Sequence, residues 1–508
     1  MIKNDSEKLN FNLYSWGLIV CALVFQILRW GIFPMFIDIY YHLSVMLGFS
    51  EAGGYTASSF WEYAPVGRPH LYPPFLHILM LIIHKMGLSE LLVAKLVSFS
   101  IYPFTLIAIW LFARSLFNSR TAFFSVLLAS SSFYFYLETS NIIGFSLALS
   151  LGLIGLVFLL RERPVSACIF MALVFYTHII VGWVVFLAVL FYAIISNKIG
   201  KYAKVLIASF LLYLPLFVHQ INNLKFLRFV DVKAKHYIEF NVVIYLVFLL
   251  SVYLLSRRKI KANKLLLSLT ASLVLLSFNF PQRIFSGSGL VVFIFWAAMA
   301  LDWIAGLGRI KQIFLIIVSF VLFFLCSPTV YLNWPKEIRF KPVNSAFINF
   351  LPELKASLQG NEVNIYTPQF IDPIVKIIKG NSQKQDIIYS NFNYSAGMFS
   401  VLSQRPTSTA MLQEVAPYKD FDKIASSSLI IWLKELNGEP SSSLKEAIYK
   451  YGLKRVAETE IVYVYRNESC RAKAKIVRAN VPFGLILLVL SLLFGGLLYD
   501  NLLAKRSA

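Results

Sequence analysis

Charged residues are scarce in this chain of 508 residues, and acidic ones more so than basic ones. Asp, Glu, Lys and Arg together make up 14% of the sequence, whereas hydrophobic residues make up 58%. Long apolar runs recur between residues 13 and 330, so the bilayer must solvate most of the chain. The composition therefore predicts a polytopic membrane protein.

Cysteine is also rare, and the four that occur stand far apart. That spacing excludes a disulfide framework and a cysteine metal site. The sequence has no internal repeat of fixed period and no low-complexity tract. The net charge of +21 would suit nucleic acid, but Lys and Arg form short clusters between apolar runs, as they do where loop charge orients a membrane protein. Nucleic acid is therefore excluded as a partner, and membrane lipids are expected.

One short apolar segment, Leu71–Met86, decides the topology. It has 16 residues, begins with Tyr72-Pro73-Pro74 and carries three basic or titratable side chains, so it suits the membrane interface better than a crossing. With this segment outside the bilayer, the positive-inside rule places every basic loop in the cytoplasm. These loops are Arg114–Arg120, Arg161–Arg163, Lys198–Lys204, Arg257–Lys264, Arg309–Lys311 and the Lys505-Arg506 tail.

Twelve spans follow from this topology, and both termini are then cytoplasmic. The first span is too long for a typical signal peptide and lacks a small-residue cleavage site, so it is expected to remain as a helix. The expected spans are 13–33, 91–113, 121–137, 141–160, 164–177, 179–196, 203–219, 241–256, 264–278, 287–304, 312–331 and 481–499.

The expected fold class is a polytopic α-helical membrane protein with a small extracytoplasmic α/β domain. Residues 1–332 form the membrane domain, with a long first external loop at 34–90, and residues 481–508 form a last helix and cytoplasmic tail. Between them, in 333–480, hydropathy falls and strand and helix patterns alternate. The clearest patterns are strands at Val363–Tyr366, Asp386–Tyr389, Ser428–Trp432 and Ile461–Tyr465, and a helix at Phe370–Lys379.

Asp38 is the most informative residue, because it stands where the first span should leave the bilayer. A charge beside apolar spans is costly unless it is used, and aromatic residues and a histidine follow it directly. Glu138 falls in the turn after the third span, and the topology places it on the same outer face. Arg283 and His178 also stand at outer ends of spans. These four side chains are therefore candidates for one reaction site at the outer membrane surface.

Three local elements resemble the GT-C superfamily of membrane glycosyltransferases. They are the run Asp38-Ile39-Tyr40-Tyr41-His42-Leu43, which is similar to the Asp-x-x-Tyr-His segments of oligosaccharyltransferase-like members, the run from Trp61 to Pro74, and Glu138. The resemblance covers the whole expected architecture. It implies a polyprenyl- or dolichyl-phosphate-linked sugar as donor, a glycan, lipid or protein as acceptor, and transfer outside the cytoplasm. It also implies that Asp38 and Glu138 can hold a divalent cation, Mg²⁺ or Mn²⁺, while the single acid in the Glu138 turn leaves metal use open.

The chemistry of such a transfer assigns the roles. A phosphate ester leaves without protonation, so the reaction needs one general base for the acceptor hydroxyl and cations for the phosphate. Asp38 is the expected base and Glu138 the second catalytic acid. Arg283 offers a two-pronged set of donors to phosphate oxygens, and His178 can donate to the same group. The other candidates for lining the cavity are Tyr41, His42, Glu62, Arg68, His70, His77, Arg228 and Lys233.

Two other classes of protein share parts of this pattern. A transporter or flippase of lipid-linked sugars would have the spans and the basic cavity, but such folds often show internal symmetry, which this sequence lacks. A scaffold that presents the outer domain would leave Asp38 and Glu138 without a function. Adjacent tryptophans are absent, and with them the Trp-Trp-Asp signature of enzymes that glycosylate protein asparagine. The acceptor is therefore left open.

Overall fold

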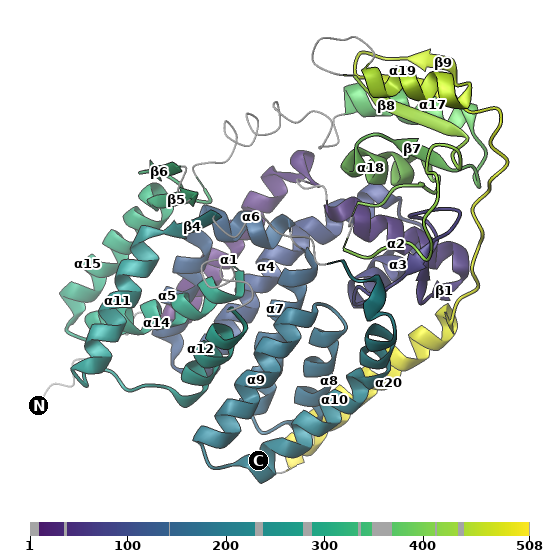
Figure 1. Ribbon diagram of the computed structural model, residues 1–508. Coiled ribbons are helices and arrows are strands. Elements are labelled where there is room, and N and C mark those ends of the chain that lie inside the picture. The colour runs from purple at the N-terminus through teal and green to yellow at the C-terminus, as the bar shows by residue number, and fades with distance from the viewer. Residues whose placement is uncertain are drawn as a thin grey trace, which may run out of the picture.

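The structure is a computed structural model that describes residues 10–34, 38–141, 143–228, 237–277, 287–333, 337–347, 368–411, 414–434 and 441–506. A body of packed helices carries a layer formed by the first loop, and an α/β domain lies over that layer (Figure 1). We call it the outer domain, and we call the end of the body that carries it the outer end, for their positions in the molecule alone. The last helix runs along the side of the body, and its C-terminal end lies far from the outer domain (Figure 1). This arrangement agrees with the helical fold class that the sequence predicts.

Apolar composition explains the helical body, since a segment in lipid must satisfy its own backbone hydrogen bonds. Among the described residues, five helices are long and apolar enough to cross a membrane, namely Phe11–Leu28, Glu90–Leu116, Ile143–Leu160, Ile199–Asn222 and Phe483–Asp500. The body consists of α1 (Phe11–Leu28), α4 (Glu90–Leu116), α5 (Ser119–Ser131), α6 (Phe133–Asn141), α7 (Ile143–Leu160), α8 (Pro164–Phe175), α9 (Ile179–Ile195), α10 (Ile199–Asn222), α11 (Val242–Ser256), α12 (Lys264–Ser277), α14 (Gly287–Ala305), α15 (Arg309–Phe320) and α20 (Phe483–Arg506).

The segment expected as one span at 121–137 is divided between two helices. Helix α5 ends at Ser131 and α6 begins at Phe133, because Ser132 has an extended backbone (φ −76°, ψ 112°) and pairs with Ser345 in an isolated bridge. The Ser132 hydroxyl accepts a hydrogen bond from the Phe135 N–H at 3.3 Å. A serine side chain that bonds to nearby backbone in this way favours a new helix start over continuation.

The first loop forms a layer of its own, built on α2 (Asp38–Ala52) and α3 (Phe75–Lys85). Helix α3 has 11 residues and is therefore about 16 Å long, well short of a hydrocarbon core of roughly 30 Å. It lies beside α2 (Figure 1). Three short strands complete the layer, namely β1 (Gly54–Tyr55), β2 (Ser58–Ser59) and β3 (Arg68–Pro69), of which β2 and β3 pair antiparallel.

The outer domain has a four-stranded sheet of order β7-β8-β10-β9, in which β7 and β8 are parallel and the other pairs antiparallel. The predicted strands at 386–389, 428–432 and 461–465 and the helix at 370–379 are confirmed, while Val363–Tyr366 lies outside the described residues. The elements are α17 (Pro368–Asn381), α18 (Asn393–Ser403), α19 (Ser442–Tyr451), β7 (Ile388–Ser390), β8 (Leu429–Leu433), β9 (Lys454–Glu458) and β10 (Val462–Arg466).

Another sheet, which is antiparallel, joins two segments that are far apart in the sequence, one before α11 and one after α15. It consists of β4 (Tyr237–Asn241), β5 (Thr329–Asn333) and β6 (Glu337–Lys341), in that order. The chain beyond it returns to the body, where the Ala346 N–H donates to the Ser131 carbonyl. The sheet thus lies at the outer end of the body, beside α6 (Figure 1).

Helix α20 is tied to the rest of the molecule at both ends. At its start, β11 (Val481–Pro482) pairs with β1. Gly54 permits this contact, because its φ is +153° and a Cβ there would collide with the Val481 carbonyl oxygen. Near its other end, buried Asp500 accepts hydrogen bonds from the Ser166 N–H at 3.0 Å and hydroxyl at 2.6 Å. A carboxylate at the first turn of α8 satisfies backbone donors that have no partner within that helix.

Candidate functional site

One segment of the outer domain, residues 407–411 and 414–418, lies across the first loop, and we call it the docking segment. Its Thr407 N–H donates to the Trp61 carbonyl at 2.8 Å, and the Ala64 N–H donates back to the Thr407 carbonyl at 3.0 Å. On its other side the Arg228 N–H donates to the Glu414 carbonyl at 2.7 Å. Backbone bonds therefore hold together the first loop, the start of the α10–α11 connection and the outer domain.

A buried ion pair lies beneath the docking segment. The Arg68 guanidinium contacts the Glu62 carboxylate, and their side chains are 3% and 1% exposed. The other Glu62 oxygen accepts from the Met411 N–H at 2.9 Å, and Arg68 also donates to the Val415 carbonyl at 3.3 Å. Burial raises the pKa of the Glu62 carboxyl, and the Arg68 charge opposes that shift. Both side chains fasten the outer domain to the first loop.

Asp38 is the first residue of α2 and is partly exposed. Burial raises its pKa to about 6, and the negative charge of Glu414 adds to the shift. Glu414 is exposed on the docking segment, so the outer domain brings a second carboxylate within electrostatic range of Asp38. Nothing in the sequence connects positions 38 and 414, and sequence reasoning missed Glu414.

Two cations, Arg228 and Lys423, lie near Tyr63 of the first loop. The Arg228 charge acts on Tyr63 of the first loop and on Lys423, whose ammonium lies 5.3 Å from the Tyr63 ring centroid. Burial lowers the pKa of Lys423, and the Arg228 charge lowers it further. Arg228 was predicted as a cavity residue, whereas Lys423 was not, because it lies far along the chain in the outer domain.

Three predicted cavity residues, His42, His70 and His77, come together in the first-loop layer. The His42 Nδ1 and His77 Nε2 atoms are 2.9 Å apart and share a hydrogen bond, and the His70 and His77 ring centroids are 5.4 Å apart. The Tyr41 ring is tilted against His42 and lies edge-on to His77. All three histidines are buried, and burial lowers the pKa of His42 and of His70 to about 3. The cluster is therefore uncharged at neutral pH.

Glu138 lies on α6, buried, within electrostatic range of Tyr245 on α11. Near it, sequence reasoning missed Arg29, which caps the end of α1. The Arg29 guanidinium lies 4.3 Å from the Tyr136 ring centroid and donates to the Ala346 carbonyl. An arginine at the end of an apolar run looks in sequence like a loop charge, and only the packing of α6 shows that it is buried.

Three predicted residues remain: His178, which caps a helix, and Arg283 and Lys233, which lie in segments outside the described ranges. The His178 Nδ1 atom accepts from the Val181 N–H at 3.5 Å and so caps α9, with its ring edge-on to Phe145 at 5.7 Å. Arg283 and Lys233 lie outside the described residues. Across the described ranges, no group of three or more His, Cys, Asp and Glu side chains is arranged to hold a metal ion.

An apolar cavity of about 460 Å³ lies between the first-loop layer and the helical body. Its walls come from α3, α8, α10 and α20, and its lining includes Tyr55, His219 and Asn480. The His219 Nε2 atom lies 3.0 Å from the His70 carbonyl oxygen, so this polar part of the lining contacts the histidine cluster. Such a cavity can take an apolar chain that carries a polar head.

Membrane-length apolar helices, an outer loop layer and an outer α/β domain define a fold of the GT-C type. No family model matches the sequence, and no curated protein matches it either. Solved structures do share the fold. ArnT from Cupriavidus metallidurans bound to undecaprenyl phosphate has a TM-score of 0.56 and 13% identity, and the match covers 90% of this chain and 99% of that one.

Two structures of the Archaeoglobus fulgidus oligosaccharyltransferase share it as well, each with a TM-score of 0.53. The complex with Zn and sulfate has 13% identity, with 89% of this chain and 73% of that one covered. AglB in complex with an inhibitory peptide and a dolichol-phosphate has 12% identity, with 90% and 74% covered. The resemblance that the Asp38–Leu43 run predicts is thus confirmed for the fold.

Proposed function

We propose that this protein is a membrane glycosyltransferase that moves a sugar from a polyprenyl- or dolichyl-phosphate to an acceptor outside the cytoplasm. The observation that supports it is the position of Asp38. This carboxyl group lies at the start of an outer helix, within electrostatic range of Glu414 on the docking segment, which also bonds to the backbone of Arg228. The fold around it is shared with structures that hold undecaprenyl phosphate or dolichol-phosphate.

In the proposed reaction Asp38 is the general base. It takes the proton of an acceptor hydroxyl while the hydroxyl oxygen attacks the anomeric carbon of the donor sugar. The bond from that carbon to the phosphate oxygen breaks, and the polyprenyl phosphate leaves with the electron pair. A single displacement of this kind inverts the anomeric configuration. Lys423, Arg228 and Arg283 are the cations that we assign to the phosphate.

The lipid part of the donor has a candidate location. The apolar cavity is lined by α3, α8, α10 and α20, of which α10 and α20 are long and apolar enough to cross a membrane. Its polar lining residues lie near the first loop. We assign the isoprenoid chain to this cavity. His178 keeps its assignment to the donor phosphate and Glu138 is assigned to the acceptor side. Asp38 and Glu138 are our candidates for holding a divalent cation, since the fold is known with Zn and sulfate in another protein.

The proposed topology has twelve spans, both termini in the cytoplasm and the site outside. The length of α3 supports it, because an 11-residue helix reaches only about half-way through the hydrocarbon core. The short helix lies in one layer with α2, and the outer domain lies over that layer, as expected of an interfacial segment.

The decisive experiment incubates the purified protein in lipid nanodiscs with a panel of polyprenyl-phosphate sugars and measures release of polyprenyl phosphate. We expect release by wild type and a loss of roughly 10²- to 10⁴-fold in Asp38→Asn. Asp420→Asn, which changes an exposed carboxylate of the outer domain, is the matched control. Parallel reactions with EDTA test the divalent cation. Movement of labelled donor across a liposome membrane without release would instead identify a flippase.

A further inference from the structure

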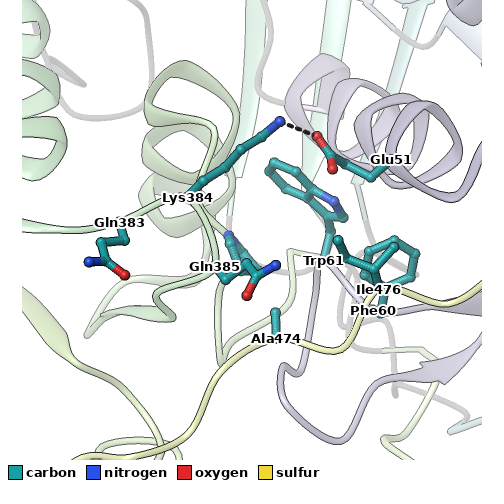
Figure 2. Close-up of a pocket in the computed structure, with 9 residues that line it drawn as sticks. Glu51, Phe60, Trp61, Gln383, Lys384, Gln385, Ala474 and Ile476 are labelled. Carbon is teal, nitrogen blue, oxygen red and sulfur yellow. Dashed lines mark ion pairs between the residues drawn. The ribbon is translucent and has the colours of Figure 1, made fainter.

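A second pocket lies where the end of α2 and the first loop meet the outer domain. Its volume is about 380 Å³, and it is lined by Glu51, Trp61, Gln383, Lys384, Gln385 and Ile476 among others. Figure 2 shows the Trp61 indole in the middle of the pocket, with the Lys384–Glu51 ion pair on one side of it and Gln385 on the other. The volume falls in the range of small-molecule sites. None of these six residues is used by the proposed transfer.

The chemistry of the lining selects an uncharged ligand rich in hydroxyl groups. Glu51 and Lys384 neutralise one another at 2.6 Å, so the pocket carries no net charge from this pair and does not favour a phosphate. Gln383 and Gln385 are exposed and offer both donors and acceptors, as a hydroxyl group requires. Ile476 is 51% exposed and supplies apolar surface for the C–H face of a ring, to which Trp61, 4% exposed, adds the small part of its surface that is accessible. We propose that this pocket binds a neutral saccharide unit.

A peptide fits this pocket less well, because the backbone around it is already paired. The Gln383 N–H donates to the Asp386 carboxylate at 2.7 Å, and the Gln385 carbonyl accepts from the Ala474 N–H at 3.1 Å. An isolated bridge between Asp386 and Lys473 continues this pairing. An extended peptide binds mainly through free backbone groups of a sheet edge, and these groups are taken.

The position of the pocket indicates how large the saccharide is, and this step rests on the proposed function. Glu51 and Asp38 lie near opposite ends of α2 and are 13 residues apart, which corresponds to about 20 Å along the helix axis. A ligand that reaches both the base and the pocket must be an extended glycan. The pocket thus assigns the acceptor class that the sequence leaves open: the protein glycosylates an oligosaccharide or polysaccharide.

Binding can be measured without any donor. The protein is placed in nanodiscs, since alkyl-glycoside detergents would compete, and titrated with glucose, galactose, mannose, N-acetylglucosamine and their linear tetrasaccharides, followed by saturation-transfer NMR. We expect saturable binding of at least one of them, tighter for the tetrasaccharide, and weakened about tenfold in Gln385→Ala and in Lys384→Ala. Lys475→Ala, an exposed neighbour on the same strand-like segment that does not line the pocket, should bind as wild type does.

The same titration with a serine-containing peptide and with inorganic phosphate separates the alternatives. Saturable binding of either one, lost in Gln385→Ala, would overturn the saccharide assignment, as would the absence of saturable binding by every saccharide. Asp38→Asn should bind the monosaccharide normally, because Asp38 lies at the other end of α2. If the saccharide binds but no donor releases its lipid phosphate, the transfer proposal fails while the subsite stands.

Discussion

The pH dependence of sugar transfer tests the role of Asp38 directly. A general base acts only when ionised, so the rate should follow the ionised fraction of this carboxyl group. With a pKa of about 6, that fraction is about nine-tenths at pH 7 and about one-tenth at pH 5. The rate of polyprenyl-phosphate release, measured at saturating donor, should therefore fall roughly tenfold between these two pH values and reach a plateau above pH 7.

Glu414→Gln sharpens this test. The variant removes the neighbouring negative charge that helps to raise the Asp38 pKa, so half-maximal rate should occur at a lower pH than in wild type. Burial is the larger cause and remains, so the shift should stop short of the ordinary value of 3.8. Glu468→Gln, at an exposed carboxylate elsewhere in the outer domain, serves as the control. Two results would refute the assignment. One is a rate that does not change between pH 7 and pH 5, and the other is a pH of half-maximal rate that is the same in Glu414→Gln as in wild type.

Three further predictions concern the fold and its orientation. Glu62→Gln leaves Arg68 buried without its counter-charge and should cost about 3–5 kcal/mol of unfolding free energy in a denaturant titration, with partial recovery in Glu62→Gln/Arg68→Met. A double variant that loses as much stability as Glu62→Gln, or more, would contradict this. Asp500→Ala should cost about 0.5–2 kcal/mol and lower the melting temperature more than Asp500→Asn, which keeps one acceptor oxygen, and equal melting temperatures would contradict the capping role. Single cysteines at 87–89 should label from outside and those at 115–118 from the cytoplasm; cytoplasmic labelling at 87–89 would make α3 a crossing.

Local sequence was sufficient to predict most helices and strands, because the hydrophobic pattern of each lies within one uninterrupted stretch of residues. The apolar segment 143–160 cannot be other than a buried or membrane helix, and Ile387-Ile388 and Leu429-Ile430-Ile431 have the apolar, partly β-branched character of sheet interiors. Asp38 was found for a similar reason, since an acid beside an apolar run stands out. The sequence did not reveal the start of α6, because that start depends on Ser132 and on its bridge to Ser345, which lies more than two hundred positions away.

The rest of the site depends on where distant segments meet, and local periodicity does not contain that information. Glu414 and Lys423 lie in unremarkable polar stretches of the outer domain, and they matter only because the docking segment crosses the first loop. The β4–β5–β6 sheet pairs residue 237 with residue 333, a register that is fixed by the path of the intervening helices. Glu62 and Arg68 were expected to line a cavity, and the structure shows them buried as a pair, which requires knowing that Met411 covers them.

The two attachments of α20 have a consequence for how the molecule is made. Ser166 leaves the ribosome 334 residues ahead of the Asp500 that accepts its hydrogen bonds, so the start of α8 stays uncapped through most of translation. Pro482, the partner of Gly54 in the β1–β11 pair, is also synthesised late. A chain that stops before β11 and α20 therefore lacks one wall of the apolar cavity, the β1–β11 pairing and the cap at the start of α8. The fold therefore gains its last contacts only when β11 pairs with β1 and α20 packs against α8.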